Sequence, residues 1–347
     1  MSKMKAGIIG CGGRGRAHAQ GYQASDDVDI IACADPIEDS GNNFAEHFSV
    51  PKVYQDYNEM LDQEDLDFVS VCTWIEMHTD MIVNAANSGI QAIHAEKPMA
   101  PTWGESKKQY QACVDNHVMI TFCHQRRFGP EFVRARELAH DGTIGDLVRV
   151  EASCGNLLDW GTHWFDMFFF YNNDEPVDWV IGQIDGTSTH RVFGVPVENC
   201  GLSWIRWKNG LEGLLGTGGT GITGAGNRLI GTHGRIEVHS SGVSLRVLAR
   251  GASDWETVDP RGAVPEGYND TTLSVLNLIE CVKTGEEPEL SGRKALQATE
   301  LIFATYESSR CRKKITLPLD IEDSPLLSMI KNGDVAEPMV AGTIGGV

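Results

Sequence analysis

The apolar residues of the first 123 positions fall into short runs that alternate with stretches of helical period. Short apolar runs bounded by turn-forming residues are typical of buried parallel strands. The predicted strands are 5–9, 28–34, 67–72, 91–95 and 118–123, and the predicted helices are 16–24, 77–88 and 105–116. This β-α-β-α order predicts an α/β domain over residues 1–123, a parallel sheet with helices on both faces.

The pattern changes after about residue 146, beyond a connecting helix predicted over 130–139. An apolar helix is predicted over 160–171, and helices over 271–283 and 293–311 close the chain's second part. The predicted strands, linked by turns, are 147–154, 179–185, 199–207, 211–217, 228–231, 236–239 and 244–249. Residues 124–347 are therefore expected to form an α+β domain with a mostly antiparallel sheet, one face free of helices. The tail from Ile321 onward is expected to end in a weakly structured, glycine-containing stretch that either frays or docks on another subunit.

A glycine-rich segment, 213–226, holds seven glycines. Such a segment can cradle a phosphate or serve as a loop between antiparallel strands. Because no helix pattern follows it, the helix dipole that would attract a phosphate is missing. We therefore favour the loop.

The composition limits the partners and the compartment. The chain has 347 residues and a net charge of −19, from 48 acidic and 29 basic residues, which disfavours nucleic acid and anionic membranes as partners. No apolar run approaches membrane-spanning length. Nine cysteines without a C-x-x-C pair indicate a reducing compartment, and we expect neither disulfides nor a bound metal. Because the first strand begins at Lys5, no signal peptide is expected, and a cytoplasmic location follows.

The run Gly10-Cys11-Gly12-Gly13-Arg14-Gly15 lies between the first predicted strand and the first predicted helix. This is G-x-G-x-x-G in the context of a dinucleotide-binding turn. Gly10 permits the tight turn, Gly12 leaves room for a pyrophosphate, and Gly15 allows the helix to pack closely on the strand. The helix N-terminus would attract the phosphates. The alternative is a glycine-rich turn without a ligand.

Asp35 decides between these two interpretations. It follows the second predicted strand, 20 residues after Gly15, where a carboxylate binds the ribose hydroxyls of NAD. A carboxylate at this position also repels the 2′-phosphate of NADP. The sequence therefore predicts NAD as the cofactor.

The motif Glu96-Lys97-Pro98 follows the strand predicted over 91–95. It is therefore expected at the carboxyl end of the parallel sheet, where open α/β sheets bind ligands. A lysine there could reach the nicotinamide end of the cofactor. The alternative is a surface lysine before a proline turn.

Asp159 and His163 stand four residues apart at the start of the apolar helix, where they would share a face. Asp159 could instead be the helix N-cap, and His163 a core histidine bonded to a backbone carbonyl. A histidine in the first helical turn meets the positive end of the dipole, which disfavours its cation and suits a general base.

Together these motifs resemble the Gfo/Idh/MocA family of glucose-fructose oxidoreductase and inositol dehydrogenase. The matching stretches occur in the family's order and cover nearly the whole chain: Gly10–Gly15 with His18, Thr73-x-x-x-x-His78, Glu96-Lys97-Pro98, Arg127-Phe128-x-Pro130, Asp159-x-Gly161-x-His163 and Gly231-Thr232-His233-Gly234. The resemblance implies a Rossmann domain followed by an α+β domain whose large open sheet forms a homodimer or homotetramer interface.

The resemblance also implies the roles of individual residues. Lys97, Asp159 and His163 form the catalytic set and bind the substrate together with Arg127 and Trp160. Besides the glycine run and Asp35, the cofactor contacts are Thr73, Trp74, His78, Glu96 and Lys97. One departure is Trp74, where the family often has proline, and we expect Trp74 and Trp160 to form walls of the sugar pocket.

The function that follows is NAD-dependent hydride transfer involving a secondary hydroxyl of a sugar, glycoside or polyol. One alternative is an NAD-dependent glycosidase that oxidises its substrate transiently, eliminates the aglycone and returns the hydride. Another is a non-catalytic NAD-binding sensor, against which the complete set of Lys97, Asp159 and His163 argues.

Overall fold

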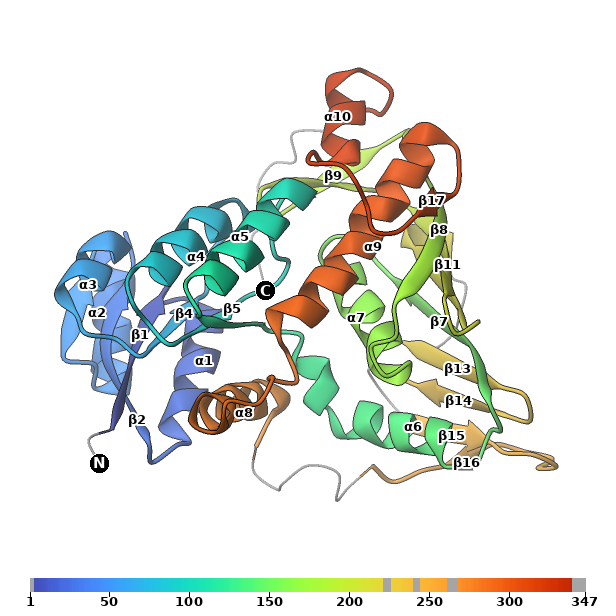
Figure 1. Ribbon diagram of the computed structural model, residues 1–347, viewed down its shortest axis with the longest axis horizontal. Helices are drawn as coiled ribbons and strands as arrows, with labels where there is room; N and C mark the ends of the chain where they lie inside the picture. The colour runs from blue at the N-terminus through green and yellow to red at the C-terminus, as the bar shows by residue number, and fades with distance from the viewer. Residues whose placement is uncertain (1–2, 221–225, 240–243, 261–267, 339–347) are drawn as a thin grey trace. The chain divides into compact units, whose positions relative to one another are not determined.

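The computed structural model describes residues 3–220, 226–239, 244–260 and 268–338 (Figure 1). The chain divides into two compact units. Unit 1 comprises Met1–Phe128 and Glu266–Leu296, and unit 2 comprises Gly129–Pro265 and Gln297–Val347. Unit 1 therefore contains a late segment that the predicted boundary at residue 123 had left in the second domain.

Unit 1 contains a six-stranded parallel sheet in the order β3-β2-β1-β4-β5-β6. Its strands are β1 (Met4–Ile9), β2 (Val28–Ala34), β3 (Lys52–Tyr54), β4 (Phe68–Val71), β5 (Ala92–Ala95) and β6 (Met119–Phe122). The prediction of a parallel sheet is confirmed. The sequence reading missed β3, a short edge strand with exposed residues and therefore without a clear apolar pattern.

Helices cover both faces of this sheet. They are α1 (Gly13–Gln23), α2 (Glu38–Phe48), α3 (Tyr57–Gln63), α4 (His78–Asn87), α5 (Trp103–Asp115) and α8 (Asp270–Thr284), with short 3-10 turns η1 (Ile75–Met77) and η2 (Gln125–Phe128). One apolar core includes residues of α3, α4 and α5, and the other includes residues of α1, α2 and α8.

The placement of α8 corrects the prediction that this helix closes the second domain. Val275 and Leu278 of α8 belong to the same apolar core as Ala19 and Tyr22 of α1, and Figure 1 shows the two helices side by side. Gly21 of α1 permits this approach, because a Cβ there would lie 2.7 Å from Val275. The spacing of apolar residues along α8 identifies a helix but not the sheet that it covers.

Unit 2 is built on a nine-stranded sheet in the order β16-β15-β14-β13-β7-β12-β11-β8-β17. Only β7 and β12 pair in parallel within the described part of this sheet, so the prediction of a mostly antiparallel sheet is confirmed. The strands are β7 (Leu147–Cys154), β8 (Val177–Ile184), β11 (Gly201–Trp207), β12 (Glu212–Thr217), β13 (Asn227–Gly231), β14 (Arg235–Val238), β15 (Leu245–Leu248), β16 (Glu256–Thr257) and β17 (Ile315–Thr316). A separate hairpin joins β9 (Thr189–Val192) and β10 (Val195–Glu198), which the sequence reading missed.

The glycine-rich segment 213–226 begins inside β12 and continues through the 3-10 turn η3 (Gly218–Thr220). Residues 221–225 of the predicted loop lie outside the described residues. The strands on either side of this segment, β12 and β13, do not pair with each other, because both flank β7. Because β12 runs parallel to β7 and β13 runs antiparallel to it, the two strands that the segment joins run antiparallel, as predicted, with β7 between them.

The remaining helices are α6 (Pro130–His140), α7 (Gly161–Tyr171), α9 (Gly292–Cys311) and α10 (Pro325–Lys331). Within the tail from Ile321, α10 is a helix that the sequence analysis did not predict, and the glycine-containing end of the tail, 339–347, lies outside the described residues. Ser324 caps α10 by accepting from the Leu327 amide, and Pro325 occupies its first turn, a sequence signal for a helix start. Among the described residues, no helix combines the length and the apolar character needed to cross a bilayer.

Candidate functional site

The glycine turn between β1 and α1 has two kinds of glycine. Gly10 has a φ of +91°, and a Cβ there would lie 2.3 Å from the Cys72 carbonyl oxygen. A Cβ on Gly15 would lie 2.0 Å from the Gly10 carbonyl oxygen. Gly12 and Gly13, by contrast, face open space. Gly10 and Gly15 therefore shape the turn, while Gly12 and Gly13 leave room for a phosphate at the first-turn amides of α1.

Asp35 is fixed by the backbone on both sides of its carboxylate. Its Oδ2 accepts from the Cys11 amide and its Oδ1 from the Ile37 amide, each at 2.9 Å. Each carboxylate oxygen has a second lone pair that remains for a ligand hydroxyl. Asp35 is thus oriented toward ligand binding by contacts to the glycine turn itself.

A cleft of about 550 Å³ runs along these residues. Its lining brings together three segments that are far apart in the sequence: the glycine turn with Gly10 and Gly12, Asp35, and the pair Thr73 and Trp74. Three large apolar side chains of the lining are notably exposed: Ile37 at 63%, Trp74 at 63% and Met77 at 45%. An apolar cleft with an anchored carboxylate suits the adenine and ribose of a dinucleotide.

Glu96, the first residue of the Glu96-Lys97-Pro98 motif, is buried and contacts Arg14 and His18. Its Oε1 accepts from Arg14 Nε at 2.6 Å and lies 3.1 Å from His18 Nε2. Burial favours the neutral acid, but the hydrogen bonds and charges of His18 and Arg14 outweigh it and lower the pKa of Glu96. Two predicted cofactor residues, Arg14 and Glu96, therefore contact each other and connect the glycine turn to the half-buried Lys97.

His78 braces the turns beside the cleft. It is buried, its Nδ1 lies 3.0 Å from the Pro98 carbonyl oxygen, and its Nε2 lies 3.1 Å from the Thr73 carbonyl oxygen. These contacts connect the turn after β4 with the turn after Lys97. They support a structural role for His78 in holding Thr73, which lines the cofactor cleft.

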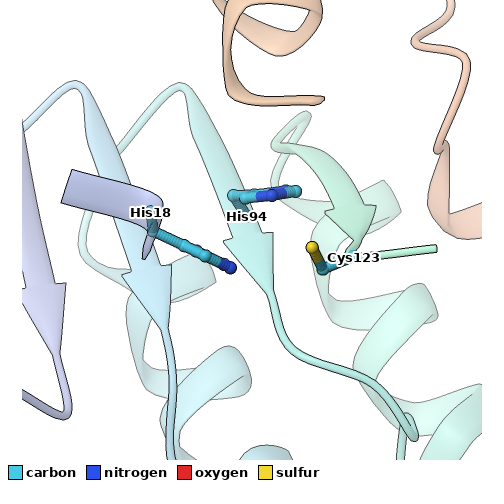
Figure 2. A group of neighbouring side chains, drawn as sticks. All are labelled: His18, His94 and Cys123. Atoms are coloured by element: carbon cyan, nitrogen blue, oxygen red, sulfur yellow. The ribbon is translucent and has the colours of Figure 1, made fainter. Parts of the chain in front are cut away.

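Two histidines and a cysteine cluster in the core of unit 1. Figure 2 shows His18 on α1, His94 on β5 and Cys123 directly after β6, and their ligand atoms lie within 4.8 Å of one another. The two imidazole rings stack, with centroids 4.4 Å apart and planes inclined by 33°.

Hydrogen bonds account for this cluster without a metal. His18 lies 3.1 Å from both Ser70 Oγ and Glu96 Oε1. His94 lies 2.7 Å from Thr121 Oγ1 and 3.2 Å from Ser274 Oγ. In addition, the guanidinium of Arg14 lies 3.3 Å from the Cys123 sulfur, where it would repel a metal cation. The contacts thus favour a buried polar network.

We expect the free energy of unfolding to decrease as the pH falls from about 7.5 to about 5.5. Burial lowers the pKa of His18, His78 and His94 in the folded protein. In the unfolded chain these imidazoles titrate near about 6.5, so below that pH the unfolded state binds more protons. Each imidazole then contributes a slope of about 1.4 kcal/mol per pH unit. Urea unfolding at several pH values measures this slope, which His94→Gln should reduce, and an unfolding free energy independent of pH would contradict the prediction.

Arg127, predicted to bind substrate, is buried in unit 1. Its side chain is 0% exposed, and its Nη1 donates to Glu289 Oε1 at 2.9 Å. This ion pair ties η2 to the segment before α9. The geometry favours a structural role for Arg127, and we leave it out of the proposed substrate contacts.

In unit 2, Asp159 lies in a tight turn before α7. The alternative interpretation of Asp159 as the helix N-cap is wrong, because α7 begins at Gly161 and Trp160 takes the cap position without a side-chain hydrogen bond. Instead, the Asp159 amide donates to Asn156 Oδ1 at 2.7 Å, and the Gly161 amide donates to the Asn156 carbonyl at 2.8 Å. Asn156 therefore fixes the turn, a role that nothing in the local sequence pattern had indicated.

His163 lies in the first turn of α7, as the sequence predicted, and only 4% of it is exposed. Trp160 is 44% exposed, and its ring centroid lies 6.3 Å from that of His163. An exposed indole beside a histidine in a first helical turn offers both an apolar wall and a group that can accept a proton.

Comparisons with known proteins agree with both units. Residues 4–124 match the GFO_IDH_MocA model, described as an oxidoreductase family with an NAD-binding Rossmann fold, and residues 148–317 match the model of that family's C-terminal alpha/beta domain. The myo-inositol 2-dehydrogenase of Thermotoga maritima is 26% identical over 349 residues, covering 90% of this chain and 98% of the relative. The D-apiose dehydrogenase of Paraburkholderia graminis is 24% identical over 370 residues, covering 96% and 95%.

Solved structures share the fold. A levoglucosan dehydrogenase in complex with NADH and L-sorbose has a TM-score of 0.79 at 19% identity, covering 92% of this chain and 100% of the other. The aldose-aldose oxidoreductase of Caulobacter crescentus, complexed with glycerol, has a TM-score of 0.77 at 19% identity, covering 91% and 100%. The succession of the two units is thus common to these proteins.

Proposed function

Since the chain belongs to the GFO_IDH_MocA oxidoreductase family, we propose that it transfers hydride between NAD and a secondary hydroxyl of a sugar, glycoside or polyol. The observation that carries this proposal is the cleft of unit 1, where the open side of Gly12 and the anchored carboxylate of Asp35 line one cavity. The relatives named as myo-inositol and D-apiose dehydrogenases support the substrate class.

The proposed roles follow from the chemistry of each side chain. When bound, NAD supplies the carbon that accepts the hydride. His163 accepts the hydroxyl proton on a ring nitrogen, and the N-terminus of α7 favours the neutral imidazole that this step needs. Lys97 stabilises the developing alkoxide by its charge. Asp159 orients the imidazole or binds a second hydroxyl. Lys97 and His163 are assigned to the same reaction because both belong to motifs that the family resemblance places in the catalytic set.

The test is to incubate the protein and NAD with a panel of myo-inositol, scyllo-inositol, D-apiose, levoglucosan and aryl glycosides. We expect NADH to accumulate with at least one sugar or polyol. Aglycone release without net NADH would overturn the dehydrogenase proposal in favour of a redox-neutral glycosidase. NAD binding without turnover of any compound would instead indicate a sensor.

Asp35→Ala should narrow the preference for NAD over NADP. In the wild type, a 2′-phosphate beside the Asp35 carboxylate should cost roughly 1–3 kcal/mol, a preference of about ten- to a hundredfold. Fluorescence titration with NADH and NADPH measures both affinities. Equal binding of the two cofactors by the wild type would refute the role of Asp35.

We also propose that the chain forms a homodimer or homotetramer through the free face of the nine-stranded sheet. Along β8 and β11, alternate residues point away from the core, and several are large, apolar and exposed: Ile181 at 40%, Leu202 at 42% and Trp204 at 41%. The Trp204 ring packs edge-on against Trp179, with centroids 5.2 Å apart. A contiguous apolar patch of this kind is typical of an interaction surface.

Light scattering should therefore give at least a dimer mass at micromolar protein, and Trp204→Glu should shift it toward the monomer. The charge would be desolvated in the interface without a partner, which costs several kcal/mol. Arg206→Glu is a suitable comparison, since it changes charge beside the apolar patch. A monomeric wild type would contradict the proposal.

We further propose a cytoplasmic location. All nine cysteines carry free thiols, and six of them are buried or near the cofactor cleft, where they behave as small apolar groups. Fractionation with a tagged chain would test this, and recovery outside the cytoplasm would oppose it.

A further inference from the structure

Glu198 is a buried carboxylate at the end of β10. It is 0% exposed and accepts three hydrogen bonds. Its Oε1 accepts from the Leu157 amide at 2.7 Å and from Thr217 Oγ1 at 2.9 Å, and its Oε2 accepts from the Tyr306 hydroxyl at 2.5 Å. One side chain thereby joins β10, the end of β12, α9 and the turn before α7.

Leu157 belongs to the turn over residues 154–160, which carries Asp159 and leads into the helix of His163. The same turn is held from within by Asn156, whose side chain accepts from the Asp159 amide and whose carbonyl accepts from Gly161. The bond from the Leu157 amide to Glu198 connects this turn to β10 through a side chain.

The chemistry of this contact explains why the residue is a glutamate. The three donors to Glu198 are neutral, and a carboxylate accepts on both oxygens, so it can serve all three at once. Burial raises the pKa of Glu198, and the hydrogen bonds from Tyr306, Thr217 and Leu157 oppose that shift. A buried amide N–H without an acceptor is costly, so removal of the carboxylate would release the turn.

We propose that Glu198 is a positioning residue that holds the 154–160 turn, and with it Asp159 and the start of the His163 helix, in the geometry for catalysis. The proposal rests on the proposed function for the roles of Asp159 and His163. Glu198 itself touches neither substrate nor cofactor in this assignment. Its effect on the reaction passes through the Leu157 amide.

The variants are chosen to separate acceptor loss from a general loss of packing. Glu198→Met keeps an unbranched chain but has no acceptor for Leu157. Glu198→Gln is the conservative variant, because its amide oxygen can still accept from Leu157 and Thr217 while its NH₂ donates to the Tyr306 oxygen. Ser203→Ala is the matched control, since it removes a buried 2.9 Å hydrogen bond between β11 and Thr305 of α9.

Amide hydrogen exchange tests the proposal without any substrate. In Glu198→Met, the peptide over 154–161 should exchange about ten- to a hundredfold faster, and in Glu198→Gln and Ser203→Ala it should exchange as in the wild type. Unchanged exchange, or faster exchange throughout unit 2, would overturn the proposal. If Glu198→Met does not fold, Glu198→Leu, which also has no acceptor for the Leu157 amide, replaces it, with acceleration in the same peptide as the expected result.

Kinetics supply the link to the reaction, measured with the panel compound of highest kcat/KM deuterated at the oxidised carbon. In Glu198→Met, kcat should fall about ten- to a hundredfold and its deuterium isotope effect should rise, while NAD affinity stays within about twofold. A purely structural role would reduce the amount of active enzyme without changing the isotope effect. If His163→Ala lowers kcat as expected and Glu198→Met leaves kcat at the wild-type value, this inference alone fails. A wild type inactive on the whole panel refutes the proposed function, while exchange still decides whether Glu198 holds the turn.

Discussion

His163→Ala should lower kcat by about 10²–10⁴-fold, the usual scale for a lost general base. The side chain is almost fully buried in the first turn of α7. If His163 is the general base, its loss leaves the hydroxyl proton of the substrate without an acceptor. NAD affinity should change little, because the anchored Asp35 and the glycine turn belong to unit 1. Steady-state kinetics together with NADH titration separate these two effects.

His140→Ala is the matched control for His163→Ala. His140 also lies in unit 2 and also contacts α7, with its Nε2 2.8 Å from the Tyr171 carbonyl oxygen, but at the opposite end of that helix. It should retain near-wild-type turnover. A His163→Ala variant as active as this control would leave His163 as a core histidine.

Lys97→Ala should cause a loss of similar size by removing the charge that stabilises the alkoxide. If Lys97 and His163 act on the same hydroxyl, the double variant should lose far less than the product of the two single losses. Strictly multiplicative losses would indicate that the two residues act on separate steps.

Gly15→Ala should destabilise unit 1 and weaken NAD binding together. Its Cβ would lie 2.0 Å from the Gly10 carbonyl oxygen, a backbone atom that cannot rotate away, so the turn must shift. Overpacking of this kind costs about 1–3 kcal/mol or more of folding free energy. A displaced turn also loses hydrogen bonds to the phosphates, each worth roughly 1.5–3 kcal/mol, which corresponds to about ten- to a hundredfold in affinity. Thermal unfolding and NADH titration measure the two effects.

Gly12→Ala should separate these two effects. Its Cβ would meet no atom within 4 Å, so the melting temperature should stay close to that of the wild type. NAD affinity should nevertheless fall by tenfold or more, because the methyl group would occupy the space proposed for the pyrophosphate. If Gly12→Ala bound NAD as well as the wild type, the phosphates could not lie against this turn.

The sequence predicted the features of the cofactor cleft that depend on local pattern. The strand-turn-helix around Gly10–Gly15 and the carboxylate of Asp35 were both identified, because each is defined by the residues that surround it in the chain. What the pattern did not show is how Asp35 is held. Its bonds to the Cys11 and Ile37 amides arise because β1 and β2 are neighbours in the sheet.

The motifs predicted which residues belong to the site, but they did not predict the contacts of these residues. Arg14 and Glu96 were both predicted as cofactor contacts, and the structure pairs them across 82 residues of chain. Arg127 was predicted to meet the substrate, and it is buried against Glu289. Motif spacing identifies which residues matter, whereas the partner of a charged side chain depends on which distant segment folds beside it.

By itself, the sequence determined the family, the order of most strands and helices and the chemistry available at each motif, because periodicity and glycine spacing act over a few residues. Only the tertiary structure decided that α8 packs on α1, that Asp159 lies in a turn fixed by Asn156, and that Glu198 receives the Leu157 amide. Each of these outcomes depends on which apolar face or buried polar group finds a partner far along the chain. Because the interior is close-packed and buried polar groups need hydrogen-bond partners, the tertiary structure selects one such pairing.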